Sequence, residues 1–257
     1  MEQLKNDIRL IAIDMDGTLL NSNHEVSEEN HQAIQRAKAK GIHVLLSTGR
    51  PLLYCREIAE LLGPSSYIVT VNGGEIYDED FNLVDRIPLK HEHVRQMWEL
   101  KQKHDVRFWS TTVQGLFNHR NPFPGELESY EWLKFGYDIP DNRIRQIIQD
   151  ELIRNKDLEV TNSSPTNIEI NPAGVNKAEA LKKVSSWLDL TMDHVMAIGD
   201  SLNDLAMIRE AGVGVAMGNA QEIVKKHAQW VTSTNEEHGV ARAIERVMDE
   251  QTKPMRG

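Results

Sequence analysis

Short apolar segments alternate with helical segments along the first third of the chain. Three predominantly apolar runs of strand length occur at residues 8–13, 42–46 and 67–71. Such runs are typical of strands that are buried on both faces of a sheet. Helices are predicted between them, at residues 28–40 and 51–62. Ser27 and Gly41 support the first helix, because serine is a favoured N-cap and glycine a favoured helix end. This βαβαβ order predicts a parallel sheet with right-handed crossovers.

The pattern changes in the middle of the chain and then returns to alternating strands and helices. We predict an α/β fold with a doubly wound parallel sheet (Rossmann-like), formed by residues 1–83 and 174–257. Residues 84–173 are predicted to form an inserted α+β cap domain. The tail at 251–257 is expected to be loose. The further predicted elements are helices at 91–104, 141–155, 177–188, 220–227 and 239–250, a helix that ends near 211, and strands at 106–109, 116–119, 158–161, 167–170, 195–198, 213–216 and 230–232.

The composition is that of an ordinary globular protein and argues against some partners. Of the 257 residues, 40% are hydrophobic, and the formal net charge is -10. Without a basic patch, binding to nucleic acid or to an anionic membrane is not expected. Cys55 is the only cysteine, which fits a reducing compartment. The N-terminal residues show no signal pattern and no run has membrane-spanning length, so we expect a cytoplasmic protein. The oligomeric state is not indicated.

Polar residues that could bind a metal or a phosphate follow four of the apolar runs. They are Asp14 and Asp16 after the first, Thr48 and Gly49 after the second, Asn72 after the third, and Asp200, Asn203 and Asp204 after the run at 195–198. Because the carboxyl ends of parallel strands share one edge of a sheet, these residues are expected to converge. Lys177 adds a cation. Carboxylates with one amine are typical of a magnesium site for phosphate chemistry, since Mg²⁺ takes one or two carboxylates and leaves room for phosphate oxygen.

Four motifs in this order resemble those of the haloacid dehalogenase (HAD) superfamily. They are DMDGTLL at 14–20, STGR at 47–50, Lys177, and GDSLND at 199–204. The chain is more closely similar to the Cof-like phosphatases of subclass IIB, which carry a large α/β cap between the second and third motifs. One position departs from the family, which commonly has Lys-Gly at the third motif. Here Lys177 is followed by Ala178, and the amine is retained.

The resemblance implies separate roles for the acids. Asp14 would attack phosphorus and form an aspartyl-phosphate, which divides one difficult step into two. Asp16 would give a proton to the leaving alkoxide and then take one from the attacking water. The side chains of Asp14 and Asp200, together with the backbone carbonyl of Asp16, would bind Mg²⁺.

Other positions of the motifs are expected to bind phosphate or to support the site. Phosphate oxygens would be held by the backbone amide of Met15 and by Thr48, Gly49 and Asn203. Lys177 would offset the charge of the phosphate and of the carboxylates. Supporting or open roles fall to Thr18, Arg50, Asn72, Gly73 and Asp204.

Two of these supporting positions have a second interpretation. Arg50 fits a substrate contact as well as a structural salt bridge. Asp204 fits a partner of the metal waters or of Lys177, but also a plain first-turn acid favoured by the helix dipole.

The sequence therefore predicts a magnesium-dependent phosphatase that hydrolyses a small phosphorylated metabolite, such as a sugar phosphate or a cofactor-precursor phosphate. A phosphotransferase or sugar-phosphate mutase of the same superfamily stays open, because transfer to a second hydroxyl would use the same residues. A phospho-metabolite binding protein with little turnover is a third alternative. No cap motif identifies the substrate, and the cap tryptophans Trp98, Trp109 and Trp132 are more typical of a core than of a ligand platform.

Overall fold

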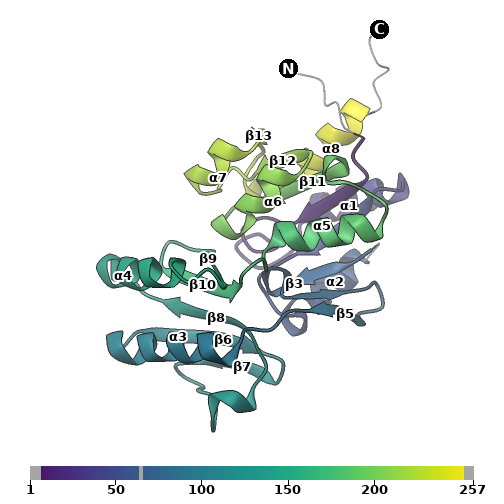
Figure 1. Ribbon diagram of the computed structural model, residues 1–257. Coiled ribbons are helices and arrows are strands. Elements are labelled where there is room, and N and C mark those ends of the chain that lie inside the picture. The colour runs from purple at the N-terminus through teal and green to yellow at the C-terminus, as the bar shows by residue number, and fades with distance from the viewer. Residues whose placement is uncertain (1–6, 64–65, 252–257) are drawn as a thin grey trace.

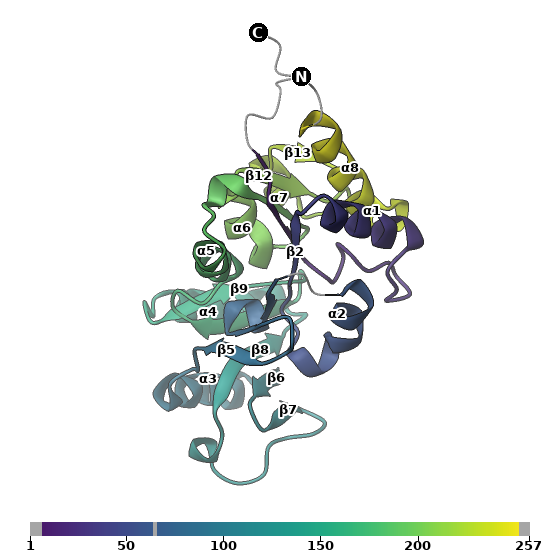
Figure 2. The ribbon, with the colours of Figure 1, turned by 90° about the vertical axis from the view of Figure 1, so that its right-hand side faces the viewer.

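The computed structural model describes residues 7–63 and 66–251, which form two β-sheets flanked by helices (Figures 1 and 2). The larger sheet has eight strands and the smaller has five. The expected loose tail lies outside the described residues from residue 252 onward. Among the described residues, no helix combines the length and the hydrophobicity needed to cross a bilayer.

The larger sheet is mainly parallel. Its strands are β1 (Leu10–Ile13), β2 (His43–Ser47), β3 (Ile68–Thr70), β4 (Glu75–Tyr77), β5 (Leu83–Arg86), β11 (Val195–Gly199), β12 (Val213–Ala216) and β13 (Trp230–Val231). They are arranged in the order β13-β12-β11-β1-β2-β3-β4-β5. All pairs from β13 to β3 are parallel, and only the last two pairs are antiparallel. The predicted doubly wound parallel sheet is therefore confirmed, and β1 lies between β11 and β2.

Helices cover both faces of this sheet. They are α1 (Glu28–Ala39), α2 (Arg56–Leu62), α5 (Lys177–Trp187), α6 (Leu205–Glu210), α7 (Glu222–His227) and α8 (Gly239–Gln251). The helices α1 and α8 pack together on one face, and α5 and α6 pack together on the other (Figure 2). Ser27 caps α1, because its side chain accepts a hydrogen bond from the amide of Asn30 at 3.3 Å. The predicted start of this helix is thus confirmed.

The region between β2 and the cap differs from the prediction in two places. The predicted helix at 51–62 consists of a 3₁₀ turn, η1 (Leu52–Tyr54), followed by α2. Between them Cys55 leaves helical geometry, and it is buried in one cluster with Met15 and Leu20. After β3, the chain forms the antiparallel hairpin β4–β5, which is not predicted from the sequence.

The smaller sheet belongs to the inserted segment and is antiparallel throughout. Its strands are β6 (Arg107–Thr112), β7 (Gly115–Asn118), β8 (Trp132–Asp138), β9 (Leu158–Thr161) and β10 (Asn167–Pro172), in the order β7-β6-β8-β10-β9. The helices α3 (His91–His104) and α4 (Asn142–Ile153) accompany it. The predicted strands at 158–161 and 167–170 are confirmed as β9 and β10, and they pair in antiparallel orientation. The central strand β8 is missing from the prediction, because Lys134 and Gly136 interrupt its apolar run.

Each sheet has its own hydrophobic cluster. The cluster of the smaller sheet contains residues between Leu89 and Ile170, and it packs α3 and α4 against one face of that sheet. We propose residues 84–173 as the cap and keep that name for them, although β5 (Leu83–Arg86) still pairs with the larger sheet. The other face of the cap sheet is directed toward the strand ends of the larger sheet (Figure 1).

The remaining elements are short 3₁₀ turns. They are η2 (Val71–Gly73), η3 (Leu127–Ser129), η4 (Met192–His194), η5 (Leu202–Asp204) and η6 (Asn235–Glu237).

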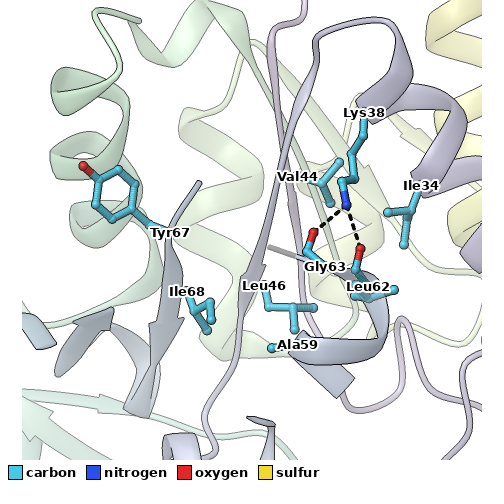
Figure 3. Close-up of a pocket in the computed structure, with 9 residues that line it drawn as sticks. All are labelled: Ile34, Lys38, Val44, Leu46, Ala59, Leu62, Gly63, Tyr67 and Ile68. Carbon is cyan, nitrogen blue, oxygen red and sulfur yellow. Dashed lines mark hydrogen bonds between the residues drawn. The ribbon is translucent and has the colours of Figure 1, made fainter. Parts of the chain in front are cut away.

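A small apolar hollow lies where α1 and α2 meet β2 and β3 (Figure 3). Lys38 of α1 closes it and donates hydrogen bonds to the carbonyl oxygens of Leu62 and Gly63, at 2.8 and 2.5 Å. The lysine thus caps the carboxyl end of α2, where backbone carbonyls lack helical partners. With a volume of about 10 Å³ the hollow has room for no more than about one water molecule, so it is a packing feature and not a ligand site.

Candidate active site

A buried lysine joins acids that follow two neighbouring strands. Asp14 comes directly after β1, Asp204 lies in η5 after β11, and Lys177 opens α5. The amine Nζ of Lys177 lies 2.5 Å from Asp14 Oδ1 and 2.6 Å from Asp204 Oδ1. All three side chains are buried, so carboxylates rather than water solvate the ammonium group. The structure therefore brings the third motif into contact with the first and the fourth.

Both carboxylate oxygens of Asp204 are engaged within the protein. While Oδ1 contacts Lys177, Oδ2 accepts hydrogen bonds from the backbone amides of Asp200 at 2.9 Å and Ser201 at 3.0 Å. These bonds fix the loop that follows β11. The contacts of Asp204 are those of a residue that positions Lys177 and the backbone of this loop.

Asp200 points toward the loop after β1. Its Oδ2 accepts a hydrogen bond from Ser201 Oγ at 2.9 Å, and Oδ1 lies 3.4 Å from Thr18 Oγ1. Gly17 permits this approach in two ways. Its φ of +77° lies in the left-handed region, and a Cβ at this position would lie 2.7 Å from Asp200 Oδ2. Thr18 therefore supports Asp200, and Gly17 leaves the space in which the two loops meet.

The acids of this cluster carry more negative charge than Lys177 can balance. Burial raises the pKa of Asp14 well above its usual value, and Asp204 raises it further while Lys177 opposes the shift. Burial and then Asp204 raise the pKa of Asp200 to about 7. Burial alone would lower the pKa of Lys177, but Asp14 and Asp204 outweigh it and raise that pKa. Three carboxylates against one ammonium group create a demand for a further cation.

The donor set fits a divalent metal ion. One oxygen of each of Asp14, Asp200 and Asp204 lies within 4.8 Å of the others. Asp14 and Asp200 line a cavity between the strand ends and the cap, whereas Asp204 is fully buried and does not line it, so Asp14 and Asp200 are the side chains that could hold the ion. Carboxylate oxygens are the ligands of hard divalent cations, and such an ion would relieve the repulsion that raises both pKa values.

Asp16 lies at the edge of this cluster and is paired with Arg50. Its side chain is about half exposed, at 49%, and forms a two-contact ion pair with the guanidinium of Arg50. One contact joins Arg50 Nε to Asp16 Oδ2 at 2.8 Å, and the other joins Nη2 to Oδ1. The structure thus shows the salt-bridge interpretation of Arg50, with the second carboxylate of the DMDG motif as its partner.

Asn72 organises the loops after β2 and β3. It adopts a left-handed conformation with a φ of +59°, and its amide N–H donates to the carbonyl of Thr48 at 2.9 Å. Its side-chain oxygen accepts a hydrogen bond from Asn203 Nδ2 at 3.3 Å. The next residue, Gly73, packs against the backbone of Asn176, where a Cβ would lie 2.7 Å from the carbonyl oxygen. Thr48, Asn72 and Asn203 are therefore brought together as the motif spacing suggests.

The cap contributes a second buried ion pair. Lys134 of β8 lies 3.2 Å from Glu169 of β10, and both side chains are about 5% exposed or less. Lys134 Nζ also donates to the carbonyl of Gly49 at 2.8 Å, and Glu169 Oε2 accepts from Asn72 Nδ2 at 2.6 Å. Burial would raise the pKa of Glu169, but Lys134, Ser163 and Asn72 outweigh it and lower that pKa. These bonds connect the cap sheet to the loops after β2 and β3.

A cavity of about 310 Å³ lies between the strand ends and the cap. This volume suits a small metabolite. The cavity is lined by Asp14, Asp16, Gly49, Arg50, Trp109, Lys134, Ser163, Asn167, Glu169, Asp200, Ser201 and Asn203. The lining residues from the larger sheet, apart from Ser201, are predicted from the sequence, whereas Lys134, Ser163, Asn167 and Glu169 of the cap are not. The available signal was a charged residue inside each of two apolar strands, WLKFGYD and NIEINP.

Known sequences resemble this chain over most of its length. A sequence model of the haloacid dehalogenase-like hydrolases matches it over residues 11–146 and 126–244. The 5-amino-6-(5-phospho-D-ribitylamino)uracil phosphatase YcsE of Bacillus subtilis is 57% identical over 238 residues, which cover 93% of this chain and 95% of that protein.

Solved structures agree with the fold. A haloacid dehalogenase-like hydrolase from B. subtilis superposes with a TM-score of 0.86 at 27% identity, and covers 93% of this chain and 100% of its own. A haloacid dehalogenase-like hydrolase from Bacteroides thetaiotaomicron gives a TM-score of 0.78 at 31% identity, and covers 93% of this chain and 99% of its own. Both coverages include the cap as well as the larger sheet.

Proposed function

Because this chain belongs to the haloacid dehalogenase-like hydrolases and is a phosphatase of a small phosphorylated metabolite, we propose that it hydrolyses 5-amino-6-(5-phospho-D-ribitylamino)uracil by way of a phosphorylated Asp14. The observation that carries the proposal is the buried contact of Asp14 with Lys177 at one end of the cavity. The substrate is suggested by the name of the B. subtilis relative, which is 57% identical to this chain over the aligned residues.

Asp14 is the proposed nucleophile. Lys177 holds one of its oxygens at 2.5 Å, which fixes the carboxylate and leaves the other oxygen to attack phosphorus. In the first step a bond forms between Asp14 and phosphorus, and the bond from phosphorus to the ribityl oxygen breaks. In the second step water attacks the same phosphorus and releases phosphate, which restores the Asp14 carboxylate.

Asp16 is the proposed acid and base. It would protonate the leaving ribityl oxygen in the first step and take a proton from the attacking water in the second. Arg50 now occupies both oxygens of this carboxylate. Since one of them must reach the leaving oxygen, we expect the ion pair to open or to tilt when the substrate enters the cavity.

Phosphate binding falls to groups at three loops. The backbone amides of Met15 and Gly49, the Thr48 hydroxyl and the Asn203 side chain are the proposed donors to phosphate oxygens. Lys177 supplies a fixed positive charge close to the reacting carboxylate, and Asp204 keeps it there. Asp14 and Asp200, with the carbonyl of Asp16, are the proposed ligands of Mg²⁺. When bound, this ion would neutralise charge that develops on the phosphoryl oxygens.

A phosphate-release assay with purified protein tests this function. We expect turnover of 5-amino-6-(5-phospho-D-ribitylamino)uracil in Mg²⁺, loss of activity in excess chelator, and recovery when Mg²⁺ is restored. Asp14→Asn should lower kcat by at least about 10³-fold, because an amide oxygen is a poor nucleophile. Asp80→Asn, in the exposed turn of the β4–β5 hairpin, is the matched control and should keep its activity. Near-normal turnover by Asp14→Asn would refute the assigned nucleophile, and full activity in chelator would refute the metal.

A further inference from the structure

The cap sheet presents one tryptophan to the cavity. Along β6 and β8, alternate residues face opposite sides of the sheet, and Phe108, Phe135 and Tyr137 pack into the cap core. Trp109 and Lys134 are directed to the other side, and both line the cavity that contains Asp14. The expectation that the cap tryptophans are core residues therefore holds for Trp98 and Trp132, which pack in the cap cluster, and is wrong for Trp109.

A glycine on the neighbouring strand makes room for this indole. Trp109 and Gly136 are direct partners in the pairing of β6 with β8. A Cβ at Gly136 would lie 2.2 Å from Trp109 Cζ2 and 2.3 Å from Cε2, which is too close for any side chain. Gly136 needs no left-handed conformation, so the space over β8 is the reason for a glycine here. The ring thus lies across β8 in a defined position.

The ring position is fixed from a second direction as well. The amine of Lys134 lies 5.0 Å from the centroid of the Trp109 ring, and it is itself held by Gly49 and Glu169. Other cap aromatic residues contact one another, for example Trp98 with Phe123. In the part of the chain that the structure describes, Trp109 has no such contact with another aromatic ring. Trp109 is thus a cap ring that lines the cavity and does not pack against the other described rings.

We propose that Trp109, seated on Gly136, is a stacking platform for a planar heteroaromatic ring in the leaving group of the substrate. The inference rests on the proposed phosphatase function and gives it a substrate class: phosphate esters whose alcohol ends in such a ring. The phosphate would lie at Asp14 and the ring at Trp109, in the same cavity. The polar groups of Lys134 and Glu169 are already paired with each other, so they hold Trp109 in place and do not form hydrogen bonds with the ring of the substrate. Stacking on a rigid indole gains affinity at low entropic cost.

Two substrates with the same phosphate end test this platform. One is 5-amino-6-(5-phospho-D-ribitylamino)uracil and the other is ribitol 5-phosphate, which lacks the ring. Wild-type protein should prefer the ring-bearing ester in kcat/KM. Trp109→Leu, which keeps an apolar side chain, should reduce this preference by about 10-fold or more, mostly through KM, because stacking of a base on an aromatic ring is typically of this size. Trp109→Phe should retain part of the preference. Gly136→Ala should also reduce it, because the new Cβ displaces the indole.

A fluorescence titration gives an independent measurement. In Asp14→Asn protein, which does not consume the substrate, the ring-bearing ester should quench tryptophan emission, and ribitol 5-phosphate should not. Combining this variant with Trp109→Leu should abolish the quenching. Trp187→Phe is the matched control, because Trp187, the last residue of α5, packs against Tyr67 and does not line the cavity, so the quenching should persist. Circular dichroism of each variant confirms folding.

The outcomes separate the platform from the proposed function. If Trp109→Leu leaves the preference within about twofold of wild type, or if wild type shows no preference for the ring, the platform is refuted while the phosphatase stands. The protein could instead hydrolyse flavin mononucleotide or uridine 5′-monophosphate and not the ribitylaminouracil ester. If Trp109→Leu then removes that activity selectively, the stacking platform is supported and the proposed substrate is refuted. If no phosphate ester is hydrolysed and no ring compound quenches, both fail.

Discussion

Replacing Lys134 by methionine should destabilise the folded protein by about 3–4 kcal/mol near neutral pH. Methionine keeps the unbranched apolar stem beside Trp109 but leaves the Glu169 carboxylate, which is 5% exposed, without its cation. Removing one partner of a buried ion pair typically costs about 3–5 kcal/mol. Glu169 keeps hydrogen bonds from Asn72 and Ser163, so the lower part of this range is expected. The loss is a large share of a typical stability of about 5–15 kcal/mol.

The size of this loss should depend on pH because the replacement changes the pKa of Glu169. In the wild type its pKa is lowered, so the stability it contributes is present above the unfolded pKa and disappears only in acid. Without Lys134, the attraction that does most to lower this pKa is lost, so the pKa of Glu169 should be higher than in the wild type. The stability that the lowered pKa contributes above the unfolded pKa is then reduced. The penalty of Lys134→Met should therefore be small near about pH 4 and grow toward about pH 7.

Urea unfolding followed by circular dichroism, at both pH values, measures the effect. Glu169→Gln keeps an acceptor for Asn72 and removes the charge. The double variant Lys134→Met/Glu169→Gln should therefore lose at least about 2 kcal/mol less stability than the sum of the two single variants. Lys183→Met is the control, because its ion pair with Asp85 is 40% and 30% exposed and should contribute less than about 1 kcal/mol. A loss below about 1 kcal/mol for Lys134→Met, or strict additivity in the cycle, would refute the reasoning.

Two further predictions concern other parts of the larger sheet. Gly17→Ala should lower kcat by about 10-fold or more and the free energy of unfolding by about 1–3 kcal/mol, because the φ of Gly17 is +77° and a Cβ would lie 2.7 Å from Asp200. An unchanged kcat would contradict the close approach of Gly17 to Asp200. Ser27→Ala should cost about 1 kcal/mol by removing the N-cap bond to Asn30 while kcat stays the same, and a changed kcat would show that α1 communicates with the cavity.

The strand ends of the larger sheet could be predicted because the rule behind them is local. An apolar run that ends in Asp14, or in Asp200, places a carboxylate at the same edge whatever the rest of the chain does. The role of Asp204 was less accessible. Its sequence position also suits a first-turn acid, and only the structure shows one oxygen on Lys177 and the other on two backbone amides. The roles assigned to the phosphate and metal ligands stay predictions.

The cap side of the cavity could not be predicted for a different reason. Lys134 and Gly136 look like interruptions of a strand until the contacts of Lys134 with Glu169 and of Gly136 with Trp109 are known. These partners are distant in sequence, and the presence of one residue of a pair does not predict the other. The contact of Asn72 with Glu169 spans 97 positions and likewise depends on how the two sheets face each other. Burial and pairing across sheets, rather than local propensity, decide which cap residues reach the cavity.

The buried carboxylate of Glu169 limits how freely the two halves of such a protein can be recombined. Of its donors, Lys134, Ser163 and Asn167 belong to the inserted segment, whereas Asn72 lies in the turn that follows β3 of the larger sheet. A chimaera that took this insertion into a different host would import the glutamate but inherit the host's residue at position 72. With an apolar residue there, one hydrogen bond to a buried anion would disappear, which typically costs about 1.5–3 kcal/mol. Domain exchange therefore requires Asn72 to travel with the insertion.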